Sequence, residues 1–122
     1  MCIRDSDLTQ YVLAMDRQNP QLAAEADSLH PAVLRMVRAT VQGAATRARP
    51  VGVCGGLAGD PFGALLLAGL GVGELSMTPN DIAGVKAGLR AASLRQLQAL
   101  ADRALDCEDA AQVRDLAKEV TA

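Results

Sequence analysis

The sequence predicts an α/β protein, because helical and strand patterns alternate along the chain. Two short runs, Val51–Cys54 and Glu74–Met77, are predicted strands, and the segments around them have helical periodicity. Half of the residues are hydrophobic but only 2% are aromatic, so Ala, Val and Leu must fill the core. Since helices separate the strands, we expect parallel pairing. A few parallel strands cannot close a sheet, so we expect part of a larger sheet or barrel.

The first six residues fit the pattern that follows poorly. We expect residues 1–6, Met-Cys-Ile-Arg-Asp-Ser, to be a foreign start left by processing, cloning or assembly. The domain is therefore predicted to span residues 7–122. From Asp7 onward the spacing is helical and predicts one apolar face. Its members are Leu8, Tyr11, Val12 and Met15.

The later elements follow from caps and apolar stripes. Residues 17–29 contain Asn-Pro and many polar side chains, which predicts a loop. A helix is expected from Pro31 towards Ala48, because proline suits the first helical position and an apolar stripe follows it. The remaining helices are predicted over 61–70, after a cap at Asn80-Asp81, over 94–105 and over 108–120.

Composition limits the classes of function. The net charge is −2 and no basic stripe or aromatic platform is present, so we expect no nucleic-acid binding. The longest apolar run, Ala64–Leu70, is too short for a membrane span, and we expect a cytoplasmic protein. Three widely spaced cysteines, Cys2, Cys54 and Cys107, indicate free thiols rather than a disulfide framework.

The segment Val51–Pro61 carries the strongest local signal for chemistry. Cys54 ends the predicted strand, glycines follow, and a helix begins at Pro61. A strand that runs through a glycine turn into a helix can present backbone N–H groups to an anion beside the thiol. A tight turn with an inert, buried cysteine remains the alternative. The second glycine cluster, at residues 69–73, follows a helix instead and is interpreted as a helix end with a tight turn.

Three other residues have two interpretations each. Asp7 could cap the first helix or bind Mg²⁺, which would require a further carboxylate or a substrate phosphate. Arg17 could be a surface charge or a phosphate clamp. If the ten residues from Asp7 to Arg17 were all helical, the two would lie roughly 15 Å apart, so a shared site requires the chain to turn back between them. His30 could pair with Cys54 in a cysteine hydrolase, but a role at the start of a helix is favoured.

Five blocks of sequence resemble the enzyme I family, the phosphoenolpyruvate–protein phosphotransferases of the bacterial sugar phosphotransferase system. They occur in order and the resemblance extends from Asp7 to the end of the chain. Parts of them are shared with pyruvate phosphate dikinase and phosphoenolpyruvate synthase, but Leu-Ala-Gly-Asp after the Cys-Gly pair favours enzyme I. The blocks are Asp7–Tyr11, Ala14–Arg17, Leu29–Leu34, Val53–Pro61 and Gly73–Met77.

The resemblance implies a fold and a reaction. The fold would be the C-terminal part of a (β/α)8 TIM barrel, from the end of strand six through strand eight, plus the closing C-terminal helices. In the family, a histidine on a separate N-terminal domain takes the phosphoryl group from phosphoenolpyruvate, leaving pyruvate, and passes that group to the phosphocarrier HPr for sugar uptake. The family uses Mg²⁺ and forms homodimers.

Carried over by position, the resemblance implies roles for four residues. Cys54 would be the proton donor to pyruvate enolate, Asp7 a ligand of Mg²⁺ and substrate, and Arg17 a substrate contact. Ser6 stands where the family has a substrate-binding asparagine, and Gly56 where it has a glutamate. The other metal carboxylate, two substrate arginines and the phosphorylated histidine have no counterpart in the sequence, so we expect a fragment that is inactive alone. The alternative is a non-catalytic dimerisation or binding module built on the C-terminal helices.

Overall fold

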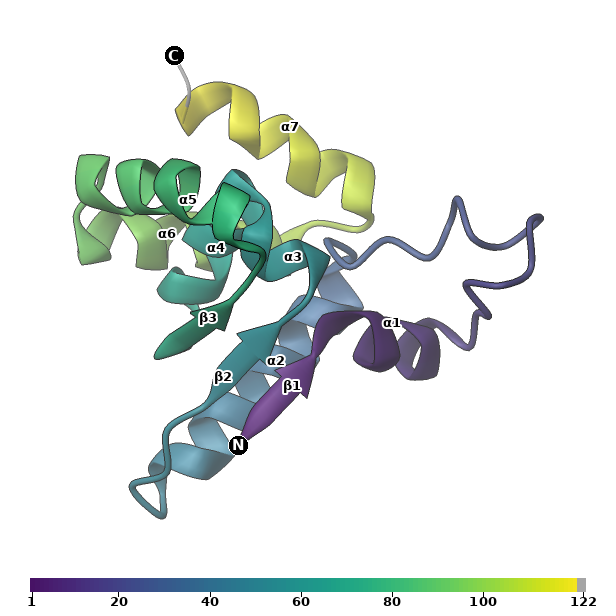
Figure 1. Ribbon diagram of the computed structural model, residues 1–122, viewed down its shortest axis with the longest axis horizontal. Helices are drawn as coiled ribbons and strands as arrows, with labels where there is room; N and C mark the ends of the chain where they lie inside the picture. The colour runs from purple at the N-terminus through teal and green to yellow at the C-terminus, as the bar shows by residue number, and fades with distance from the viewer. Residues whose placement is uncertain (121–122) are drawn as a thin grey trace.

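The computed structural model describes residues 1–120, which form a small parallel sheet and a larger number of helices (Figure 1). The strands lie in the order β1-β2-β3, and both neighbouring pairs are parallel. The elements in chain order are β1 (Cys2–Arg4), α1 (Asp5–Leu13), α2 (Pro31–Ala45), β2 (Gly52–Cys54), α3 (Gly56–Gly59), α4 (Pro61–Gly69), β3 (Glu74–Ser76), α5 (Pro79–Ala91), α6 (Leu94–Asp106) and α7 (Ala110–Val120).

Helices cover one face of the sheet and leave the other open. The middle residues of the three strands, Ile3, Val53 and Leu75, are paired in register and join the hydrophobic core. Alternate residues point to the opposite face, because side chains alternate along a strand. We call this the uncovered face, and it carries Cys2, Arg4, Cys54, Glu74 and Ser76.

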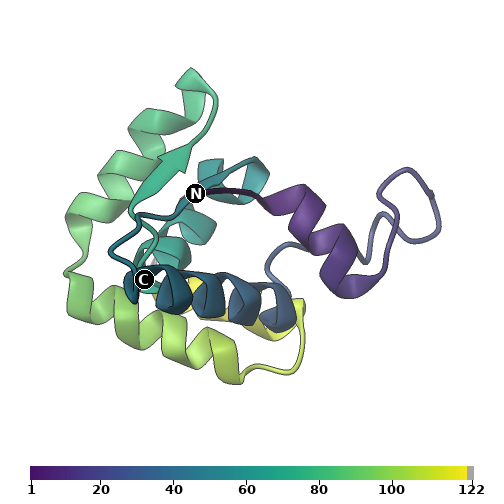
Figure 2. The ribbon, with the colours of Figure 1, turned by 90° about the horizontal axis from the view of Figure 1, so that it is seen from below.

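The helical layer is built around α2, α4 and α6. In Figure 2 α2 and α6 lie side by side, and the sheet lies above them in this view. The Arg35 guanidinium of α2 donates to the carbonyl of Leu105 at the end of α6, through Nε at 3.0 Å and Nη2 at 2.5 Å. The core consists of small aliphatic side chains. Its fully buried members include Val33, Leu34, Val53, Leu66, Leu67 and Val113.

Helices α4 and α6 approach each other closely at Gly69. A Cβ atom on this glycine would overlap the carbonyl oxygen of Leu97. Gly71, two residues after the end of α4, has φ +95°, a left-handed conformation that glycine adopts without strain. The interpretation of this glycine cluster as a helix end with a tight turn is therefore confirmed.

Most predicted elements are confirmed, but the cap predicted at Asn80-Asp81 was wrong, because α5 begins at Pro79 with Thr78 as its N-cap residue. Two further differences lie near the start of the chain. Residues 2–4 form a strand, β1, where no element was predicted, and the first helix begins at Asp5 rather than Asp7. Whether residues 1–6 have a foreign origin stays a prediction. The predicted apolar face of α1 was wrong for Tyr11, which is 87% exposed, whereas Asp5 and Thr9 are buried.

The inward face of α1 is polar because its buried groups are hydrogen-bonded. The Thr9 hydroxyl donates to the carbonyl of Asp5 at 2.7 Å and also bonds the hydroxyl of Ser28 at 2.8 Å. A buried polar group with partners costs little free energy, so such a face can pack inward. Within residues 1–120, no helix has both the length and the apolar character needed to cross a bilayer.

The close approach at Gly69 predicts a large effect of a single methyl group. We expect Gly69→Ala to lower the free energy of unfolding by about 2 kcal/mol, because α4 and α6 must move apart. Gly84 in α5 faces open space. The matched control, Gly84→Ala, should therefore raise the free energy of unfolding by about 0.5–1 kcal/mol. Urea denaturation followed by circular dichroism measures both; equal effects would contradict the packing at Gly69.

Candidate active site

The candidate site lies where the three parallel strands end. Arg4, Cys54 and Ser76 are the last residues of β1, β2 and β3, and they are paired in register across the sheet. We call this line the carboxyl edge. The Cys54 side chain lies on the uncovered face and is half-buried. The sequence prediction that Cys54 ends a strand before a glycine turn is confirmed.

The glycine turn after Cys54 is occupied by a carboxylate of the chain itself. Gly55 has φ +127°, and a Cβ atom there would collide with the carboxylate of Asp5. The Asp5 side chain is 4% exposed, and its Oδ2 accepts a hydrogen bond from the Leu57 N–H at 2.5 Å. The sequence analysis expected this turn to offer N–H groups to an external anion. In the structure, the Asp5 carboxylate accepts the hydrogen bond of the Leu57 N–H in place of such an anion.

Two hollows flank the glycine turn. The first, of about 430 Å³, lies between the end of β1 and the end of the α1–α2 segment, and Asp5, Ser6 and Leu57 contribute to its wall. The second lies between the ends of β2 and β3. Gly55, Gly56, Ser76, Met77, Thr78 and Asp81 line it. A small ligand at the carboxyl edge would therefore find open space on both sides of Gly56.

The two thiols on the uncovered face influence one another. Cys2 is paired with Gly52, two residues before Cys54 in β2. The neighbouring Cys54 side chain, together with partial desolvation and the charge of Glu74, raises the pKa of the Cys2 thiol. Burial raises the pKa of the Cys107 thiol, which lies at the end of α6 and is independent of this pair.

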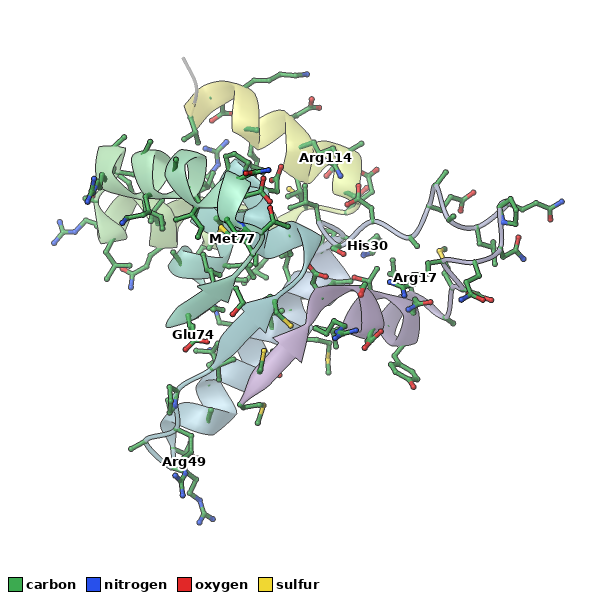
Figure 3. The ribbon with its side chains drawn as sticks, in the orientation of Figure 1. Arg17, His30, Arg49, Glu74, Met77 and Arg114 are labelled. Carbon is green, nitrogen blue, oxygen red and sulfur yellow. The ribbon has the colours of Figure 1, made fainter. Side chains whose placement is uncertain are left out.

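The chain turns back between Asp7 and Arg17, as a shared site requires. Helix α1 ends at Leu13, and Ala14 adopts a left-handed conformation with φ 52°. The Arg17 N–H then donates to the side chain of Gln10 at 3.2 Å, one helical turn after Asp7. Figure 3 shows Arg17 beside the end of α1. Both Asp7 and Arg17 are exposed.

The described residues do not by themselves form a Mg²⁺ site. Asp7 contributes one exposed carboxylate, which lies 3.9 Å from Nε of Arg4. Within residues 1–120, no group of three or more His, Cys, Asp or Glu side chains is arranged to hold a metal ion. The nearby carboxylate of Asp5 is held by the Leu57 N–H. Mg²⁺ at Asp7 would need further ligands from outside this segment.

His30 has the structural role that the sequence favoured. Its Nδ1 accepts a hydrogen bond from the Ala32 N–H at 3.1 Å, so the imidazole caps the N-terminus of α2. Pro31 follows as the first residue of the helix. The geometry therefore gives no support to a cysteine hydrolase.

Sequence reasoning missed Asp5, Asp27 and Arg114. Asp5 was set aside with the first six residues, although an acidic residue at the start of a helical pattern is a common N-terminal signal. Asp27 accepts hydrogen bonds from Arg114 at 3.0 and 2.7 Å. No local pattern could have revealed this pair, because the two residues lie 87 positions apart.

Comparison with known proteins identifies the family. The sequence model of the PEP-binding domain of PEP-utilising enzymes matches residues 1–94, well over half of the chain. The chain belongs to the PEP-utilising enzymes. The match includes the strands β1, β2 and β3 and the whole carboxyl edge, so the candidate site lies inside the part that the family defines.

Individual relatives extend the similarity to α7. A multiphosphoryl transfer protein of Xanthomonas campestris is 73% identical over 114 residues, which are 93% of this chain and 14% of that protein. One from Rhodobacter capsulatus is 54% identical over 114 residues, again 93% of this chain and 14% of the relative. The phosphoenolpyruvate-protein phosphotransferase of Cupriavidus necator is 41% identical over 122 residues, 97% of this chain and 21% of the relative. The chain thus spans a seventh to a fifth of their lengths.

The contact between the two thiols predicts a change in reactivity. Because Cys54 raises the pKa of Cys2, Cys54→Ala should lower that pKa and increase the thiolate fraction of Cys2 at about pH 8. Iodoacetamide should then alkylate Cys2 faster, as measured by mass spectrometry of the Cys2 peptide. Cys107 in the same molecule is the control and should react at an unchanged rate. An unchanged rate at Cys2 would contradict the contact.

Proposed function

We propose that this chain forms part of the phosphoenolpyruvate-binding barrel of a phosphotransferase, in which Cys54 protonates the enolate of pyruvate. The observation that carries the proposal is the position of Cys54. Its half-buried thiol lies at the carboxyl edge of a parallel sheet, on the uncovered face and directly before the glycine turn. Residues at this end of barrel strands face the reaction centre in barrel enzymes.

The chemistry of the proposal requires an acid at this place. When the phosphoryl group leaves phosphoenolpyruvate, the remaining three-carbon unit is an enolate. The Sγ–H of Cys54 gives its proton to the methylene carbon, a C–H bond forms, and pyruvate and a thiolate result. A positioned acid of this kind contributes about 10²–10⁴-fold to a rate.

Arg17 and Asp7 complete the proposed roles in this segment. The Arg17 guanidinium would contact the substrate, since its planar fork suits phosphate and carboxylate oxygens. Asp7 would supply one ligand of Mg²⁺, with other ligands from outside the segment. Ser6, in the wall of the first hollow, would take the place of the family's asparagine at the substrate.

The barrel itself is part of the proposal. The open edges of β1 and β3 and the uncovered polar face suit a sheet that continues into further strands, as in a (β/α)8 barrel. The segment would then contain the end of strand six through strand eight and the closing helices. Gly56, at the position of the family's glutamate, would leave open space where the two hollows meet the glycine turn.

The partners belong to the same proposal. The Cupriavidus necator relative is named a phosphoenolpyruvate-protein phosphotransferase, and the Salmonella typhimurium relative, 43% identical over 109 residues, is named for the phosphoenolpyruvate-dependent phosphotransferase system. We infer phosphoenolpyruvate as substrate, HPr as acceptor through a histidine domain, a homodimeric assembly and a cytoplasmic location. A fragment of pyruvate phosphate dikinase or phosphoenolpyruvate synthase is the second candidate.

The chain alone should not perform the transfer. The proposed site needs ligands and arginines from other strands, and the phosphorylated histidine from another domain. Purified chain incubated with isotope-labelled phosphoenolpyruvate and HPr should leave HPr unlabelled, as measured by gel autoradiography. Labelled HPr would contradict the division of the site between this segment and the rest of the protein.

The role of Cys54 can be tested in a complete site. The 114-residue segment matched in the Xanthomonas campestris relative can be replaced by the corresponding segment of this chain. We expect this graft to transfer the phosphoryl group from phosphoenolpyruvate, and Cys54→Ala in the graft to lower kcat by about 10²–10⁴-fold.

The matched control in the graft is Cys107→Ala, which removes a thiol distant from the carboxyl edge and should leave kcat unchanged. If Cys54→Ala and Cys107→Ala gave the same kcat, Cys54 would not be the proton donor. A folded graft that transferred nothing from phosphoenolpyruvate to HPr would favour the second candidate.

A further inference from the structure

The segment between α1 and α2, residues 14–30, has no helix or strand, yet it is fixed at both ends. At its start, the Arg17 N–H donates to the side chain of Gln10. At its end, the Ser28 hydroxyl hydrogen-bonds to the buried hydroxyl of Thr9 at 2.8 Å. Between these points the segment loops away from the body of the protein, as Figure 1 shows. The position of Arg17 therefore depends on how firmly both ends are held.

Asp27 holds the later end through both of its carboxylate oxygens. Oδ1 accepts the Leu29 N–H at 2.9 Å and fixes the local turn that leads into α2. Oδ2 accepts Nε and Nη2 of Arg114 at 3.0 and 2.7 Å. Arg114 lies on α7, and Figure 3 shows it on the part of α7 nearest to His30 and the end of the segment.

We infer that Arg114 is a positioning residue that fixes the later end of the segment carrying Arg17 to the body of the protein. The turn at Leu29 is local and cannot anchor the segment to anything else. Arg114 adds an anchor to the one that Ser28 makes with Thr9, because it joins Asp27 to a helix whose Val113 and Leu116 are buried in the core. An arginine suits this role better than a lysine, since Nε and Nη2 can both donate to Oδ2 while Oδ1 stays with the Leu29 N–H.

The pair lies at the candidate site. Asp27 and Arg114 line the first hollow together with Asp5, Ser6 and Leu57 at the carboxyl edge. The Asp27 side chain is 23% exposed, so its charge is partly shielded from water and salt. The inference rests on the proposed function only for the statement that Arg17 contacts substrate. The anchoring itself follows from the contacts alone.

A second ion pair on α7 provides a matched control. Arg103 of α6 donates to Glu119 of α7 through two bonds of 2.8 and 2.9 Å. Like the Asp27–Arg114 pair it has two N–H···O bonds, although here they reach both oxygens of a more exposed carboxylate, and it joins two helices without touching residues 14–30. Removing it tests the general effect of losing an α7 ion pair.

The experiment compares Arg114→Gln, Asp27→Asn and Arg103→Gln in the 122-residue chain by hydrogen exchange and limited trypsin digestion. In Arg114→Gln and Asp27→Asn we expect exchange of residues 15–26 and cleavage after Arg17 to speed up by about two- to five-fold, the range of an exposed ion pair. Cleavage after Arg47, in the turn after α2, is an internal reference and should not change.

Arg103→Gln should leave exchange of residues 15–26 and cleavage after Arg17 as in the parent chain. Arg114→Lys keeps a charge for Asp27 and should restore part of the protection, which a purely structural loss on α7 would not allow. An equal acceleration in Arg103→Gln, or none in Asp27→Asn, would overturn the inference. Hydrogen exchange and trypsin cleavage are both measured without substrate. The proposed function could therefore fail in the graft while the anchoring is confirmed. Equally, the anchoring could be overturned while the graft remains active.

Discussion

The structure depends on a parallel sheet that helices cover on one face only. Ile3, Val53 and Leu75 point into the helical layer and are held there by the Ala, Val and Leu core. Their strand neighbours must therefore face the other way, because side chains alternate. This alternation sends Cys54 and Ser76 to an open polar face. The exposure of the thiol is thus a consequence of packing on the opposite side of the same strand.

The second constraint acts at the glycine turn after β2. Gly55 has a conformation that side chains rarely adopt, and the space where its Cβ would stand holds the Asp5 carboxylate. Asp5 needs a hydrogen-bond donor because it is buried, and the Leu57 N–H needs an acceptor because the short helix α3 leaves it free. One contact satisfies both groups and joins the first residue of α1 to the turn beside Cys54.

The sequence was sufficient for the features that depend on neighbouring residues. Strands β2 and β3, the cap at His30 and the turn at Gly71 follow from local patterns, and the structure has all of them. Features that depend on distant partners were not predictable in this way. The Asp5 carboxylate accepts a hydrogen bond from the Leu57 N–H, 52 positions away in the sequence. Tyr11 points outward because hydrogen-bonded polar side chains are buried on the opposite side of α1.

The C-terminal helices contribute to the structure in two ways. Helix α6 packs against α4 and α2 and closes the core, which any well-packed helix could do. Helix α7 adds a charged contact, because Arg114 reaches the Asp27 carboxylate at the end of the exposed segment. Since Asp27 also fixes the turn at Leu29, movement of α7 and movement of the segment are coupled through one carboxylate. A helix far from the strands in sequence thereby contributes to the wall of the first hollow, beside Asp5 and Leu57.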